Sequence, residues 1–182
     1  MADQPGFKNP DMTYVDKGLK FKLISPDAEW PWEAAKAEIT EGPLKGYICH
    51  PGMDPYEDLA GPFGYKTRDD GTSLTAFYAE EKHLNGGGFL HGGLLMTFAD
   101  TALFNIGGEH LNGPSVTLNL SGDFTAAAPK GRMIFADGQV MKATRGLVFV
   151  QGRIFDEDEG KERVLLSFSG IVKKLKMPKV VS

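Results

Sequence analysis

The sequence contains little of what several classes of protein require: it has one cysteine, no excess of basic residues and no long apolar run. The single Cys49 excludes an internal disulfide framework and a cysteine-rich zinc site. The 20 Lys and Arg residues against 24 Asp and Glu give a net charge of -4, without the basic patch that nucleic-acid binding requires. No stretch approaches the ~20 apolar residues of a membrane helix, and residues 1–10 lack a signal-peptide pattern. We therefore expect a cytoplasmic protein that binds neither nucleic acid nor membranes.

Motifs for a serine nucleophile, for nucleotides and for metals are missing as well. The sequence has no G-x-S-x-G nucleophile elbow and no Walker sequence. Residues 86–93 begin G-x-G-x-x-H instead of G-x-G-x-x-G and precede a single helix, so they do not predict a dinucleotide site. The 4 His residues lack HxxxH or HExxH spacing. We expect no bound metal and no separate cofactor.

The length of 182 residues is typical of one domain, and the second half of the chain has clear secondary-structure patterns. Five segments rich in aromatic and β-branched residues predict strands: 73–80, 115–124, 132–142, 147–156 and 163–174. Within the second of these, Val116, Leu118 and Leu120 alternate with polar residues. Residues 94–106 are apolar on nearly every face and predict one buried helix. Short, turn-like connections favour antiparallel neighbours, so we predict an α+β protein whose antiparallel sheet wraps around a central helix.

Residues 1–55 have no strong periodicity, and we expect them to form an N-terminal extension laid over the main domain. Residues 25–39 predict a short helix, with Asp27 as its cap and Pro31 in its first turn. Three residues of this helix would share one face: Trp32, Ala35 and Ile39. Residues 42–64 predict a loop, because Gly and Pro recur every few residues. The expected division is an extension over 1–55, a domain over 56–176 and a tail over 177–182.

The start of the predicted central helix has features of an anion-binding site. A helix N-terminus presents unpaired backbone N–H groups and a partial positive charge. Gly92 and Gly93 have no side chains, so a ligand oxygen can approach these N–H groups closely. Such a site could stabilise a carbonyl oxygen as negative charge develops on it. The alternative is that the two glycines only permit a tight turn against the sheet.

Asp100 is the only charged residue of this otherwise apolar helix. Burying a carboxylate is costly unless it has a partner, so Asp100 is either a functional group or a core residue that caps a neighbouring backbone group. It lies eight residues beyond Gly92, which corresponds to about 12 Å along a helix axis. A base and an oxyanion donor that serve one carbonyl must lie within about 3–4 Å of the reacting atoms. Two antiparallel helices related by a two-fold axis would satisfy this requirement, and we therefore expect a homodimer.

Three short segments around this helix resemble the signature of hotdog-fold acyl-CoA thioesterases of the phenylacetate-degradation (PaaI) type. They are His83-Leu84-Asn85, residues 88–93 with sequence GFLHGG, and Phe98-Ala99-Asp100. Residues 124–131 and 144–152 resemble that family too, and the likeness extends over about residues 56–176. The resemblance implies the hotdog fold, in which an antiparallel sheet wraps a central helix, preceded here by the N-terminal extension.

The resemblance also implies roles for individual residues. Asp100 would activate or orient water, or attack the thioester directly. The Gly92 N–H would bind the thioester carbonyl, and Asn85 would line the site from the partner subunit. His91 would shape the helix entrance and contact the thioester. Some family members position water with a Ser or Thr of the next strand, for which Ser115 is the first choice and Thr117 the second.

We therefore expect hydrolysis of an acyl-CoA thioester to free acid and CoA by a homodimer or a dimer of dimers. Lys130 and Arg145 are candidate contacts for the phosphates of CoA, with a solvated face as the alternative. Two other functions stay open at this point. One is a hotdog hydratase or dehydratase of enoyl thioesters, in which His91 and Asp100 would act together. The other is a non-catalytic hotdog module that binds acyl-CoA.

Overall fold

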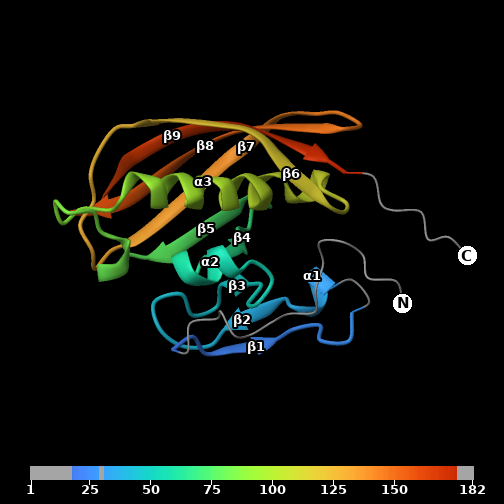
Figure 1. Cartoon of the computed structure of the whole chain (residues 1–182), viewed down its shortest axis with the longest axis horizontal. Helices are drawn as coiled ribbons and strands as arrows, with labels where there is room; N and C mark the ends of the chain where they lie inside the picture. The colour runs from blue at the N-terminus through green and yellow to red at the C-terminus, as the bar shows by residue number, and fades with distance from the viewer. Residues whose placement is uncertain (1–17, 29–30, 176–182) are drawn as a thin grey trace, which may run out of the picture.

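A computed structural model describes residues 18–28 and 31–175 of the chain. Within these residues, one antiparallel sheet of nine strands curls around a long helix, in the order β1-β2-β3-β4-β5-β7-β8-β9-β6. Figure 1 shows the central helix α3 below strands β6 to β9, with α2 and β1 to β3 on its other side. The α+β hotdog architecture predicted from the sequence is therefore confirmed.

The central helix α3 spans Gly92–Gly107, close to the predicted 94–106. His91 caps it, since its side chain accepts a hydrogen bond from the Gly93 N–H. One face packs against the sheet and is fully buried, and its residues are Leu95, Phe98, Ala99, Ala102 and Leu103. At 16 residues it is the longest helix, and no helix in the described ranges is long and apolar enough to cross a membrane.

The predicted strands all form, with small changes at their ends. They are β5 (Ser73–Tyr78), β6 (Ser115–Phe124), β7 (Met133–Ala143), β8 (Leu147–Asp158) and β9 (Lys161–Lys174). Gly138 and Gly152 face each other where β7 and β8 pair. A Cβ at Gly138 would lie 2.3 Å from the Gln151 carbonyl oxygen, so only glycine fits this close approach.

In the part of the chain that the structure describes, strand β6 forms one edge of the sheet and pairs only with β9. Its pairing register shifts between Thr117 and Asn119, as a β-bulge does. Because of this shift, Thr117 and Leu120 both face inward, while Val116 and Leu118 are 42% and 55% exposed. The alternating apolar residues of this strand therefore do not share one face.

The helix expected over residues 25–39 is mostly wrong. Only α1, Pro31–Ala34, is helical, and residues 29–30, between the expected cap Asp27 and this helix, lie outside the described ranges. Ala37–Ile39 form strand β2, which pairs with β1 (Phe21–Leu23) and with β3 (Ile48–Cys49). The buried–exposed–buried pattern of β2 is the period of a strand, and pairing with distant residues overrides the local helix signal.

The loop expected over residues 42–64 contains β3 and the helix α2, Pro55–Ala60. Asp54 caps α2 by accepting hydrogen bonds from the Tyr56 and Glu57 N–H groups, and Pro55 occupies its first position. Strand β4, Gly64–Thr67, then pairs with β3 through Ile48 and Tyr65. The sheet thus runs without a break across residue 55, where we expected the extension to end.

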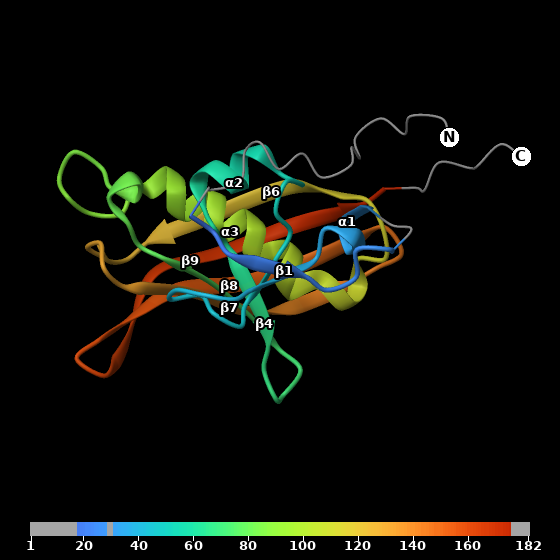
Figure 2. The ribbon, with the colours of Figure 1, turned by 90° about the horizontal axis from the view of Figure 1, so that it is seen from below.

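Aromatic packing fixes the segment after α2 against α3. Phe98 of α3 contacts Phe77 of β5 and Phe63, with ring centroids 4.7 and 5.3 Å apart. His83, in the short helix η2 (Glu81–His83), accepts a hydrogen bond from the Glu80 N–H and donates one to the Ala60 carbonyl. Short helix η3, Gly108–His110, follows α3, and residues 177–182 lie outside the described ranges. Figure 2, seen from below, shows α2 lying alongside α3.

Candidate active site

Asp100 lies at the middle of α3, half-buried, with its carboxylate next to β6. Thr117 Oγ1 donates a hydrogen bond of 2.6 Å to Asp100 Oδ1. Thr117 lies on the inward side of β6, directly before the register shift, and its hydroxyl orients the acid. Within the described ranges, Asp100 caps no backbone group, and its second carboxylate oxygen has no hydrogen-bond donor. The arrangement matches a functional carboxylate better than a core aspartate.

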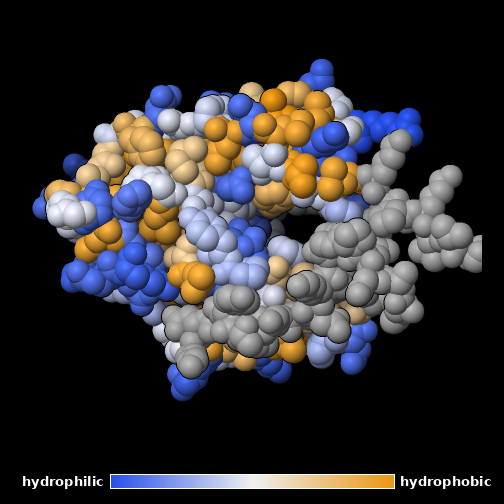
Figure 3. All heavy atoms as spheres, viewed as in Figure 1, coloured by the Kyte–Doolittle hydropathy of each residue, from blue (hydrophilic) through white to orange (hydrophobic). Residues whose placement is uncertain are grey.

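A cavity of about 630 Å³ opens beside Asp100, between α3 and the N-terminal extension. Figure 3 shows this hollow to the right of the centre of the molecule. Helix α3 and strand β6 line one side with Asp100, Thr101, Phe104, Ser115 and Thr117. The extension, α2 and strand β4 line the other side with Trp32, His50, Glu57 and Tyr65. Apolar rings and a few polar groups in one concave site are typical of a small-molecule pocket.

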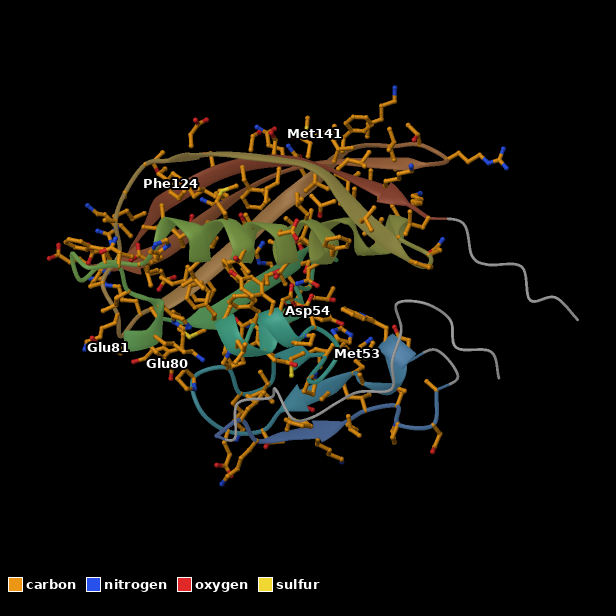
Figure 4. The ribbon with its side chains drawn as sticks, in the orientation of Figure 1. Met53, Asp54, Glu80, Glu81, Phe124 and Met141 are labelled. Carbon is orange, nitrogen blue, oxygen red and sulfur yellow. The ribbon has the colours of Figure 1, made fainter. Side chains whose placement is uncertain are left out.

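The helix entrance contains the predicted donor group. His91 Nδ1 accepts the Gly93 N–H at 2.9 Å, so that N–H is already occupied. The Gly92 N–H has no acceptor within the described part of the chain. A Cβ at Gly92 would lie 3.3 Å from the ring of Phe124, and Figure 4 shows Phe124 above the start of α3. Gly92 is thus the available donor, whereas Gly93 provides space.

Asn85 lies in the exposed loop that precedes α3. Its Oδ1 accepts hydrogen bonds from the Gly87 N–H at 2.8 Å and from the Phe89 N–H at 3.3 Å. These bonds shape the glycine-rich loop at the helix entrance. The structure does not bring Asn85 to Asp100 within one chain, and its assignment to the partner's site stays a prediction.

The remaining predicted site residues differ in position. Ser115 lines the same cavity as Asp100, but the hydrogen bond to that carboxylate comes from the second choice, Thr117. Both residues lie on the inward side of β6, two positions apart. Lys130 pairs with Glu81 near the helix entrance. Arg145 is exposed and lines a second cavity of about 290 Å³ with His110 and Lys174.

Glu57 of α2 is a cavity residue that sequence reasoning missed. Thr101 Oγ1 donates a hydrogen bond to Glu57 Oε1 and so links α2 to α3 next to Asp100. Burial raises the pKa of Glu57 to about 7, against the opposing effect of the Thr101 hydrogen bond, and nearby carboxylates add to the rise. The sequence Asp54-Pro55-Tyr56-Glu57 could have predicted α2, because it combines an N-cap with proline at the first helical position.

The extension supplies an aromatic part of the cavity wall next to Glu33. The His50 ring lies between Trp32 and Tyr65, with centroids 4.8 and 5.8 Å away. Burial lowers the pKa of His50 to about 4, with a further contribution from Lys36, so this histidine is neutral at pH 7. Burial also raises the pKa of Cys49 to about 12, which suits a buried thiol and not a nucleophile.

The His, Cys, Asp and Glu side chains are the groups that could bind a metal ion. Within the described ranges, no three His, Cys, Asp or Glu side chains are arranged to hold a metal ion. The sequence-based expectations of no metal and no cofactor stay predictions.

Two sequence comparisons place this site in a family. Residues 87–162 match the thioesterase superfamily. The Pseudomonas aeruginosa protein named "Putative esterase PA0474" is 33% identical over 122 residues, which cover 64% of this chain and 86% of that protein. The fold, the helix entrance and these matches define a hotdog-fold protein. The chain belongs to the thioesterase superfamily.

Solved structures show the same fold. The TT0310 protein of Thermus thermophilus superposes with a TM-score of 0.56 at 25% identity, covering 67% of this chain and 98% of its own. The Escherichia coli PaaI protein from the phenylacetic acid degradation operon gives 0.58 at 21% identity, covering 68% and 86%. The BH2602 protein of Bacillus halodurans, solved with CoA, gives 0.60 at 18% identity, covering 69% and 81%.

Proposed function

We propose that the protein hydrolyses an acyl-CoA thioester to a free carboxylic acid and CoA, at a site shared between two subunits. The observation that carries the proposal is the Asp100 carboxylate, oriented by Thr117 beside a cavity of about 630 Å³. Membership in the thioesterase superfamily supports the reaction class. The CoA in the related Bacillus halodurans structure supports the choice of thioester.

The reaction assigns one task to each group. The thioester carbonyl oxygen accepts a hydrogen bond from the Gly92 N–H at the positive end of α3, which stabilises the negative charge of the tetrahedral intermediate. Asp100 takes a proton from water as the water oxygen attacks the carbonyl carbon, or attacks that carbon itself. Thr117 holds Asp100 in place in either case. The acyl group enters the slot between the two subunits, with the pantetheine in its mouth, and no metal or redox cofactor takes part.

Two subunits are needed because one helix separates its own donor from its own acid. The eight residues from Gly92 to Asp100 correspond to about 12 Å, too far for both groups to act on one carbonyl. The free edge of β6 is where we place the second copy. Unpaired strand edges readily pair with another chain, and the outward Val116 and Leu118 side chains are exposed in one chain.

The two residues proposed to contact the CoA phosphates differ in whether they already have an ion-pair partner. Arg145 lies beside Lys174 and His110 in the smaller cavity, and we propose that this basic group meets the phosphates. Lys130 already pairs with Glu81, so phosphate binding would require it to exchange partners.

Release of free thiol from a panel of acyl-CoA substrates tests the reaction. The Asp100→Asn variant keeps the shape of the side chain and should reduce turnover by at least about 10²-fold, the usual contribution of a general base. Tight binding of acyl-CoA without thiol release would indicate a non-catalytic module. A change in enoyl absorbance without thiol release would indicate a hydratase. Equal turnover by the wild type and Asp100→Asn would refute the role of Asp100.

Complementation tests the shared site. Gly92→Pro removes the one N–H group at a helix position that accepts proline, and Gly92→Ala adds a Cβ but keeps the N–H. If Gly92→Pro and Asp100→Asn dimers are dissociated and reassociated together, half of the dimers are mixed and each contains one intact site. Activity should then return to about a quarter of wild type, as two-fold symmetry requires. A mixture as inactive as its parents would contradict a shared site.

A further inference from the structure

Glu57 of α2 is hydrogen-bonded to α3 directly next to Asp100, while its neighbour Tyr56 bonds to Thr97 of the same helix. Glu57 Oε1 accepts the hydrogen bond of Thr101, the residue next to Asp100. Both carboxyl groups line the same cavity, and their charges interact. Thr117 occupies one oxygen of Asp100 and Thr101 one oxygen of Glu57. The site therefore has two carboxyl groups, each oriented by one hydroxyl.

The chain holds Glu57 rigidly in this position. Asp54 caps the helix and accepts the Glu57 N–H at 3.0 Å, and Figure 4 shows Asp54 at the start of α2, below α3. The Glu57 carbonyl in turn accepts the Gly61 N–H at 2.7 Å. His83 anchors the last residue of the helix through the Ala60 carbonyl. A carboxyl group on a helix fixed at both ends is preorganised for one geometry.

No cation compensates Glu57 within the described ranges, where none of the ion pairs includes it. The carboxyl groups that interact with it are Asp54, Asp58 and Asp100. The same cavity is also lined by Glu33, Tyr65 and the neutral His50. The carboxylates repel a negative charge on Glu57, and burial removes its hydration. Near pH 7 the group therefore retains a proton in a large fraction of molecules. A structural role alone would not require a carboxyl group at such a cost.

We propose that Glu57 is the second acid–base residue of this site and protonates the sulfur of the departing CoA thiolate. The inference rests on the proposed thioester hydrolysis. Two carboxyl groups that line one cavity can divide acid and base work between them when one of the two retains its proton. Asp100 then acts as the base and Glu57 as the acid.

The proton balance closes over one turnover. Asp100 accepts a proton from water while the water oxygen forms its bond to the carbonyl carbon. When the carbon–sulfur bond breaks, its electron pair goes to sulfur, and Glu57 gives its proton to that sulfur. The carboxylic acid product loses its proton to solvent. Transfer of the proton from Asp100 to Glu57 restores both groups.

The test compares Glu57→Gln with the wild type and with Glu38→Gln, a matched control on an exposed residue of β2. Turnover is measured from pH 5.5 to 9 on an acyl-CoA and on the same acyl group carried by thiophenol. Glu57→Gln should lower kcat on acyl-CoA by about 10²-fold and remove the fall in wild-type kcat expected above about pH 7. Its effect on the thiophenyl ester should be at least about tenfold smaller, because an aryl thiolate leaves without protonation. Glu38→Gln should behave as the wild type.

The possible results distinguish failure of the Glu57 proposal from failure of the proposed hydrolysis. Unchanged kcat and an unchanged pH profile in a folded Glu57→Gln variant would overturn the proposal while leaving hydrolysis intact. An equal loss on both esters would also overturn it, since Glu57 would then position Asp100 or bind the acyl group. Absence of thiol release by the wild type would instead refute the proposed function itself. Circular dichroism and gel filtration of the variant verify its fold and assembly.

Discussion

Replacement of Glu57 by Gln should stabilise the folded protein at neutral and alkaline pH. Burial and neighbouring carboxylates raise the pKa of Glu57 from 4.5 to about 7, so the folded state binds its proton more tightly than the unfolded state. The free energy of unfolding must then fall as pH rises from about 4.5 to 7, and it should level off above that range. Gln carries no charge at any pH and escapes this loss.

The magnitude follows from the two pKa values. At about 1.4 kcal/mol for each tenfold change in proton affinity, the difference corresponds to roughly 3 kcal/mol as an upper bound. Glu57 is only half-buried in a single chain, and solvent screening reduces the effect. We therefore expect the stability gain of Glu57→Gln over wild type to grow by about 1–2 kcal/mol between pH 5 and pH 8.

Urea unfolding followed by tryptophan fluorescence measures this gain at pH 5, 6, 7 and 8. Protein concentration is held fixed, because dimerisation would couple unfolding to dissociation. Asp58, whose pKa burial also raises, to about 6, is present in both proteins, so most of its contribution cancels in the difference. If the wild type and Glu57→Gln have parallel stability–pH curves, the argument for a protonated Glu57 is wrong.

Three further substitutions test the site, the sheet and the assembly. Thr117→Val removes the hydrogen bond to Asp100 and should lower kcat about tenfold with little change in Tm, measured by thiol release and calorimetry. Gly138→Ala places a Cβ 2.3 Å from the Gln151 carbonyl and should cost about 3 kcal/mol in urea unfolding, so a wild-type midpoint would contradict the close approach. Leu118→Arg should shift the protein from dimer to monomer in sedimentation, and an unchanged dimer would exclude this edge as the interface.

The sequence predicted the parts of the fold whose signals are local. Helix α3 and strands β5 to β9 have long, clear patterns, and the structure places all of them within a few residues of prediction. The prediction for the extension was wrong because β1, β2 and β3 are two or three residues long and form only by pairing with neighbouring strands. Strands this short show no recognisable period in the sequence. Residues Trp32 to Ile39 have a helix-like pattern, but pairing of Ala37 with Cys49 places the end of this segment in the sheet.

Some residues of the candidate site could likewise be predicted from the sequence, and others could not. Asp100 and Gly92 could be predicted because they lie on one helix with a fixed rise per residue. The choice between Ser115 and Thr117 could not be settled from the sequence, since both point to the same side of β6 and only the packing of β6 against α3 decides which one reaches Asp100. Glu57 was missed because 43 residues separate it from Asp100 in sequence, and only the packing of α2 on α3 joins the two.

The side-chain pattern of β6 gives a second, independent reason to expect a partner. On a solvent-exposed edge strand, apolar residues face the core and polar residues face water. Over Ser115 to Leu118 this order is reversed, with the hydroxyl of Thr117 turned to α3 and the apolar Val116 and Leu118 turned outward. The inward hydroxyl is explained by Asp100, which needs a donor. The outward apolar pair is explained only if something covers it, and a two-fold copy that pairs along β6 would do so while bringing its own Gly92 toward this Asp100.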